Sequence, residues 1–152
     1  MKELYRFENE VSKGYQGNIS YVCQLPENTN SLHVKLSYNK DRIHNIYSYV
    51  NEYHDELATV YENYLNHTPT NNELETFVNN MKTEIQLCLF MDNEFVGNIH
   101  KPGKVKEIQI SKEHVSNGCI EVNEFKRNIK IVVNVFQVIE EGTKYTLTVE
   151  SE

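Results

Sequence analysis

The sequence predicts a mainly β fold: a jelly-roll-like antiparallel β-sandwich that carries an inserted hairpin of two helices. Apolar and polar residues alternate in several short segments, which turn residues separate about every 8–12 positions. The hydrophobic period changes from 2 to 3.6 within residues 41–82 and then changes back. No repeat or linker divides the 152 residues, so we expect a single domain over 1–152 with the helical insertion at 41–82.

Predicted strands lie on both sides of the insertion. We expect hairpins at residues 19–38, 84–99 and 128–150, each turning at a cluster of polar residues. Weaker alternation predicts further strands at 3–12, 105–110 and 119–122. In the last hairpin one strand face carries only apolar residues, and several more lie on the other face, which is typical of a strand in the middle of a sandwich. That apolar face consists of Ile129, Ile131, Val133 and Val135.

The insertion has the pattern of two amphipathic helices. Apolar residues from Ile43 to Leu65 follow helical spacing in one stripe, which predicts a single first helix with Asp41 at its N-cap. Residues 70–73 read Thr-Asn-Asn-Glu, a capping box that starts a second, short helix reaching Met81. We expect the stripe to attach the helices to the sandwich.

Charge and composition exclude several classes of protein. A net charge of −7 is unsuited to a protein that binds nucleic acid directly, since binding the phosphate backbone needs clustered Lys and Arg. No run of 18 apolar residues and no apolar leader segment is present, so we expect neither a membrane span nor a signal peptide. Cys23, Cys88 and Cys119 show no pairing pattern, which predicts free thiols and a cytoplasmic location.

Parts of both ends resemble a known domain. Residues 19–38, with the turn Leu-Pro-Glu-Asn-Thr at 25–29, and residues 118–122, 129–138 and 145–147 carry the similarity. This pattern resembles the β-sandwich domain that precedes the catalytic part of some PHP-superfamily metallohydrolases and that also occurs in stand-alone bacterial proteins. Ile129 stands where that family commonly has Trp, and the His- and Asp-rich metal motifs are missing. The resemblance therefore implies a fold and transfers no catalytic residue.

No constellation of residues predicts an enzyme. The six histidines lack metal-ligand spacing, the glycines form no phosphate-binding loop, and no nucleophile motif is present, so we expect no catalysis, no cofactor and no metal. His54 falls inside the apolar stripe and is a candidate general base if buried. The alternative, which we favour, is a histidine that fills space in the core.

The insertion concentrates the negative charge. Residues 41–82 contain seven acids against Arg42 and Lys82, a net charge of −5. The acids opposite the stripe are the predicted partner-binding residues: Glu52, Asp55, Glu56 and Glu62. They predict a non-catalytic interaction module that binds the basic surface of another protein, and one version is an inhibitor, encoded by a mobile element, that occupies a nucleic-acid-binding site. A plain solvated helix face is the alternative interpretation.

Ten tyrosines suggest a second function. Tyr38, Tyr49 and Tyr53 could line a groove for a carbohydrate or another small ligand, as aromatic faces do. The competing interpretation places the helix tyrosines in the core, on an amphipathic helix that seals one open side of the sheet.

Overall fold

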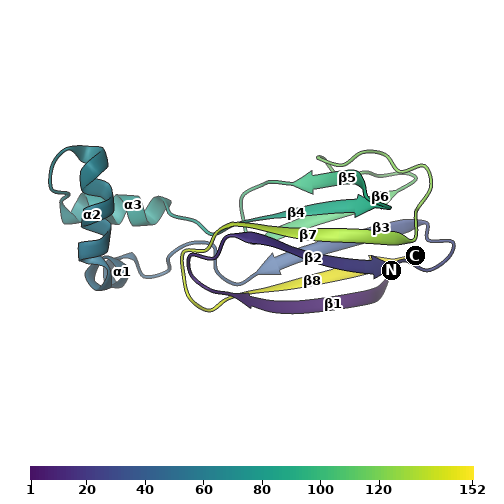
Figure 1. Ribbon diagram of the computed structural model, residues 1–152, viewed down its shortest axis with the longest axis horizontal. Helices are drawn as coiled ribbons and strands as arrows, with labels where there is room; N and C mark the ends of the chain where they lie inside the picture. The colour runs from purple at the N-terminus through teal and green to yellow at the C-terminus, as the bar shows by residue number, and fades with distance from the viewer.

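A computed structural model describes residues 1–152 as a β-sandwich with a small group of helices at one end (Figure 1). The sandwich consists of two four-stranded antiparallel sheets, with strand orders β1-β8-β3-β6 and β2-β7-β4-β5. Its strands are β1 (Lys2–Val11), β2 (Gly17–Gln24), β3 (Ser31–Tyr38), β4 (Glu84–Met91), β5 (Glu94–Ile99), β6 (Val105–Ser111), β7 (Asn128–Gln137) and β8 (Thr143–Ser151). The prediction of a mainly β, antiparallel sandwich is confirmed.

The chain pairs with itself like one long, folded hairpin. Its tip is the β4–β5 turn, and β3 pairs with β6, β2 with β7, and β1 with β8. Asp92 and Asn93 at the tip have φ angles of 46° and 65°. Positive φ at both central residues is the backbone of a type I′ turn, whose twist matches that of the strands it joins. The predicted hairpin at 84–99 is therefore confirmed.

Strand alternation positions the main core. Ile129, Ile131, Val133 and Val135 of β7 are all buried, and they join Leu147 of the opposite sheet in one hydrophobic cluster. Because side chains of a strand alternate between its faces, a period of 2 sends one complete set inward. β7 lies between β2 and β4, as expected for an interior strand.

The other two predicted hairpins, at 19–38 and 128–150, are wrong. β2 and β3 lie in different sheets, and so do β7 and β8. The β7–β8 connection begins with the buried Val138 and Ile139, which cross from one sheet to the other instead of forming a tight turn. The predicted strand at 119–122 is a single bridge between Gly97 and Cys119. Alternation identifies a strand but does not specify its sheet.

The insertion contains three helices where two were predicted. They are α1 (Ile46–Glu52), α2 (His54–Leu65) and α3 (Asn71–Asn80). The first predicted helix is interrupted at Tyr53, whose φ of −110° and ψ of 22° lie outside the helical range. Asn45, not Asp41, caps α1, because its Oδ1 accepts a hydrogen bond from the backbone N–H of Ser48 at 3.0 Å. The capping box at Thr70 and Glu73 is confirmed.

The helices form a lobe with its own hydrophobic core, which we call the helical lobe (residues 43–81). Tyr49, Val50, Leu57, Leu74 and Val78 make up this second cluster, together with Ile43 and Ile139. The apolar faces therefore pack against one another, and the expectation that the stripe attaches the helices to the sheet is wrong. Only Ile139 enters the cluster from the sandwich. None of the three helices has the length and apolar character needed to cross a bilayer.

A narrow neck joins the helical lobe to the sandwich. The backbone N–H of Thr83 donates to the carbonyl of Asp41 at 2.8 Å, so the two ends of the insertion lie side by side. Figure 1 shows the helices beyond one end of the sandwich, with both chain termini at the opposite end. The lobe therefore projects from the sandwich and covers neither sheet.

Candidate functional site

The helical lobe carries negative charge and contains no Lys or Arg of its own. Residues 46–80, which include all three helices, contain six acids and neither Lys nor Arg. Glu52 at the end of α1 and Asp55, Glu56 and Glu62 on α2 are all exposed, and we call these four residues the acidic face. None of them forms an ion pair with a Lys or Arg side chain. Their charge is thus available to a partner.

Large apolar side chains are exposed on the same lobe. Tyr47 on α1 is 69% exposed, and Val60 and Tyr64 on α2 are 55% and 79% exposed. The uninterrupted stripe predicted all three to be buried, and that prediction is wrong. The single predicted helix is interrupted at Tyr53, which separates Tyr47 on α1 from Val60 and Tyr64 on α2. No Gly or Pro marks the interruption, so helical spacing alone could not locate these residues.

An open groove runs beside Tyr47. It has a volume of about 510 Å³ and lies between α1 and α3. Tyr47, Glu75 and Asn79 are among the residues that line it. The lobe therefore offers a concave surface with one aromatic and one acidic side chain.

The tyrosines of the predicted ligand site do not line one groove. Tyr49 is buried, and its ring lies 4.6 Å from that of the half-buried Tyr53. The ammonium of Lys13, from the β1–β2 turn, lies 3.8 Å from the centre of the Tyr53 ring. This cation–π contact connects the lobe to the sandwich and occupies the aromatic face that a sugar would need. Tyr38 is buried elsewhere, at the end of β3.

The remaining candidate residues lie apart from one another. His54 is exposed, with its Nδ1 atom 3.4 Å from a carboxylate oxygen of Asp55, so the expected core position is wrong. Cys23, Cys88 and Cys119 are free thiols, and burial raises the pKa of each. A raised pKa keeps a thiol protonated and weakly nucleophilic. No three metal-ligand side chains come together.

The fold and the site define a class of protein: a two-sheet β-sandwich that presents an acidic helical lobe. A model of a family of unknown function (DUF6669) matches residues 1–152, and the chain belongs to that family. Neither the curated proteins nor the solved structures provide a match. The family match does not connect the chain to PHP-superfamily metallohydrolases, so that resemblance stays a prediction.

Proposed function

We propose that the protein is a non-catalytic interaction module whose helical lobe binds the basic surface of another protein. The observation that carries this proposal is the composition of the lobe surface. Six acids stand there without any Lys or Arg, next to the exposed Tyr47, Val60 and Tyr64. The four residues of the acidic face and these three exposed side chains are not needed for the lobe to fold, because the lobe core is built from other residues.

The two kinds of side chain have different roles in binding. Unpaired acids steer a positively charged partner toward the lobe and raise the association rate. Exposed tyrosines supply the apolar contact area on which affinity depends, and tyrosine is enriched among the residues that dominate binding energy. The expected partner surface therefore has Lys and Arg around a recess that accepts an aromatic ring.

One version of this function is inhibition of a nucleic-acid-binding protein. A surface that binds a phosphate backbone is rich in Lys and Arg, so an acidic lobe is complementary to it. An inhibitor of this kind, encoded by a mobile element and acting in the cytoplasm, would compete directly with the nucleic acid. The three free thiols support a reducing compartment.

We also assign the sandwich to the jelly-roll class. Its support is the strand order, in which the eight strands fold back around the β4–β5 tip and are shared equally between two sheets. In this arrangement the sandwich is the base, and the insertion between β3 and β4 carries the proposed binding surface.

Site-specific photo-crosslinking in the native host tests the proposed function. A photoreactive amino acid replaces Tyr47 or Tyr64 on the lobe and, in matched controls, Val22 or Phe136, which are exposed on the sandwich. We expect the lobe positions to capture one basic protein and the sandwich positions to capture none of it. Equal capture from both sets of positions, or capture from the sandwich alone, would refute the lobe as the binding surface.

A further inference from the structure

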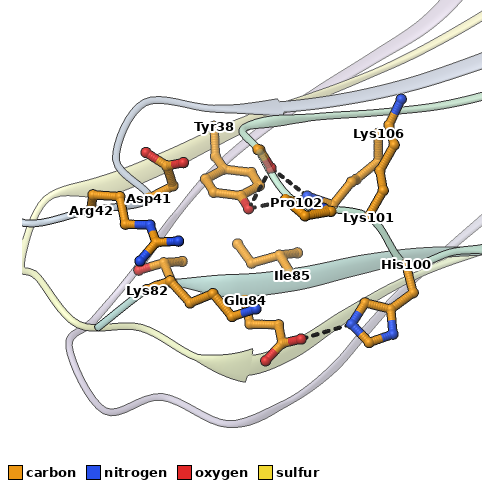
Figure 2. Close-up of a pocket in the computed structure, with 12 residues that line it drawn as sticks. Tyr38, Asp41, Arg42, Lys82, Glu84, Ile85, His100, Lys101, Pro102 and Lys106 are labelled. Carbon is orange, nitrogen blue, oxygen red and sulfur yellow. Dashed lines mark hydrogen bonds and ion pairs between the residues drawn. The ribbon is translucent and has the colours of Figure 1, made fainter. Parts of the chain in front are cut away.

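A small polar hollow lies where the helical lobe joins the sandwich (Figure 2). Its walls come from the end of β3, the two chain segments of the neck, the start of β4, the β5–β6 turn and the start of β6. Its volume is about 120 Å³, well below the roughly 300–1,000 Å³ of pockets for drug-sized ligands. It therefore has room for a small ion or for one functional group of a larger molecule.

Lys106 is the unusual residue of this hollow. It lies on the same face of β6 as the buried Ile108 and Ile110, so the strand directs it to the core side, and it is only 2% exposed. Its Nζ donates to the carbonyl of Gly103 and to the hydroxyl of Tyr38, the latter at 3.3 Å. Figure 2 shows Lys106 and Tyr38 among the residues that line the hollow. No carboxylate lies within 4.0 Å of the ammonium.

A buried ammonium without a counter-ion is unfavourable. Moving a charged group from water into the protein interior costs roughly several kcal/mol unless an opposite charge or further hydrogen bonds compensate for the lost hydration. Here burial lowers the pKa of Lys106, and the two acceptors are both uncharged. An ammonium has three N–H donors, and these two acceptors use only two of them, so one donor can still bind a ligand.

The surroundings of Lys106 are positive, in contrast to the rest of the protein. Arg42, Lys82, Lys101 and Lys106 line the hollow against two acids, Asp41 and Glu84, in a chain whose net charge is −7. Glu84 is already engaged, because its carboxylate accepts from Nε2 of His100 at 2.8 Å. The local charge therefore favours an anion.

We propose that this hollow is a binding site for a small anion with a carboxylate or phosphate group, held by the ammonium of Lys106 and by Lys82. The anion would supply the missing counter-charge and accept charge-assisted hydrogen bonds, which are shorter and stronger than neutral ones. The neck residues Arg42, Lys82 and Thr83 belong to the wall, so binding also connects the lobe to the sandwich.

NMR titration of the intact protein with inorganic phosphate, and separately with acetate, tests the proposal at low ionic strength. We expect saturable shifts of the backbone amides of Thr83, Lys101 and Gly103. Lys106→Met keeps a long apolar side chain and should weaken binding by about tenfold or more, since a hydrogen bond to a charged group contributes roughly that factor. The anion bound more tightly identifies the group that the site accepts.

Two further variants make the test specific. Lys104→Met removes a charge from the same turn but outside the hollow, and it should leave affinity unchanged. Lys82 lies on the exposed rim of the hollow, and Lys82→Gln should weaken binding a few-fold. This second variant keeps the test decisive if Lys106→Met does not fold. The proposal is overturned if neither anion shifts these amides at roughly ten millimolar, or if Lys104→Met weakens binding as much as the hollow variants do.

Discussion

Burial of the Tyr38 side chain makes the stability of the protein depend on pH. Burial raises the pKa of its hydroxyl to about 12, with smaller contributions from Asp41 and Glu84. The unfolded chain releases this proton near pH 10, so the stabilisation is complete below pH 10 and is lost as the pH rises toward 12. A shift of this size corresponds to about 3 kcal/mol.

We therefore predict that the free energy of unfolding, measured with urea, decreases between pH 10 and 12. Tyr38→Phe should flatten this decrease, whereas Tyr47→Phe, on the exposed lobe surface, should retain it. Burial also raises the pKa of Tyr145, so some decrease remains in both variants. A wild-type slope in Tyr38→Phe would contradict the assignment.

Lys106 has the opposite effect on the pH dependence. Its pKa is lowered by burial, so the native state loses a proton before the unfolded state does, and stability rises as the pH approaches 10.5. Without bound anion, we predict that Lys106→Met raises the free energy of unfolding by about 1 kcal/mol near pH 7 and removes this rise. Urea unfolding at a series of pH values measures both effects, and a destabilised Lys106→Met protein would contradict the prediction.

The sequence already carried part of the information on Lys106. Alternation predicted the strand at 105–110, and Lys106 lies on the same face of that strand as the buried Ile108 and Ile110. Alternation could not show that the β5–β6 turn and the neck enclose a hollow there, because those segments are distant in sequence. The acidic face could be predicted, since charge along a short insertion is readable directly. The exposed tyrosines beside it could not.

Among the elements, α3 depends most clearly on one local interaction. The Thr70 hydroxyl accepts from the N–H of Glu73 at 3.2 Å, and the Glu73 carboxylate accepts from the N–H of Thr70 at 3.2 Å. We predict that Thr70→Ala destabilises the helical lobe by about 1 kcal/mol. Hydrogen exchange should speed up in α3 while exchange in β4 stays unchanged, because the lobe has its own core.

A control for this prediction lies in the same helix. The hydroxyl of Thr76 donates to the carbonyl of Asn72 at 2.9 Å within α3 and caps nothing. Thr76→Ala should be neutral or slightly stabilising, since alanine is the better helix former. Equal effects of the two variants would show that the cap does not hold the helix.

Prediction from sequence succeeded for elements with a regular period and failed where the chain changes direction. The β4–β5 hairpin could be predicted because its turn residues and both strands are adjacent. The crossings after β2 and β7 could not, since the same alternation fits a hairpin or a change of sheet. Tyr53 interrupts a helix with neither Gly nor Pro, while its ring contacts both Tyr49 and Lys13, the latter from another segment. Such long-range contacts leave no local pattern.

At the scale of the whole molecule, the neck predicts that the sandwich folds without the lobe. The hydrogen bond between Thr83 and Asp41 brings the ends of the insertion together, so a short Gly-Ser linker can replace residues 43–81. Ile139 is exchanged for Thr in the same variant, because deletion would expose it. Far-ultraviolet circular dichroism should show a cooperative β-rich fold, and an unfolded deletion variant would contradict two separate cores.

The association rate of the protein with the partner captured by crosslinking tests the central claim most directly. It is measured at two salt concentrations for the wild-type protein and for a variant with Glu52, Asp55, Glu56 and Glu62 all changed to Lys. A matched control changes Glu10, Glu94, Glu113 and Glu121, which are exposed on the sandwich, and reaches the same net charge. We predict that the lobe variant associates about tenfold more slowly or worse at low salt and loses its salt dependence, while its unfolding curve shifts by less than about 0.5 kcal/mol. Wild-type rates in the lobe variant, or equal slowing in the control, would contradict the helical lobe as the binding surface.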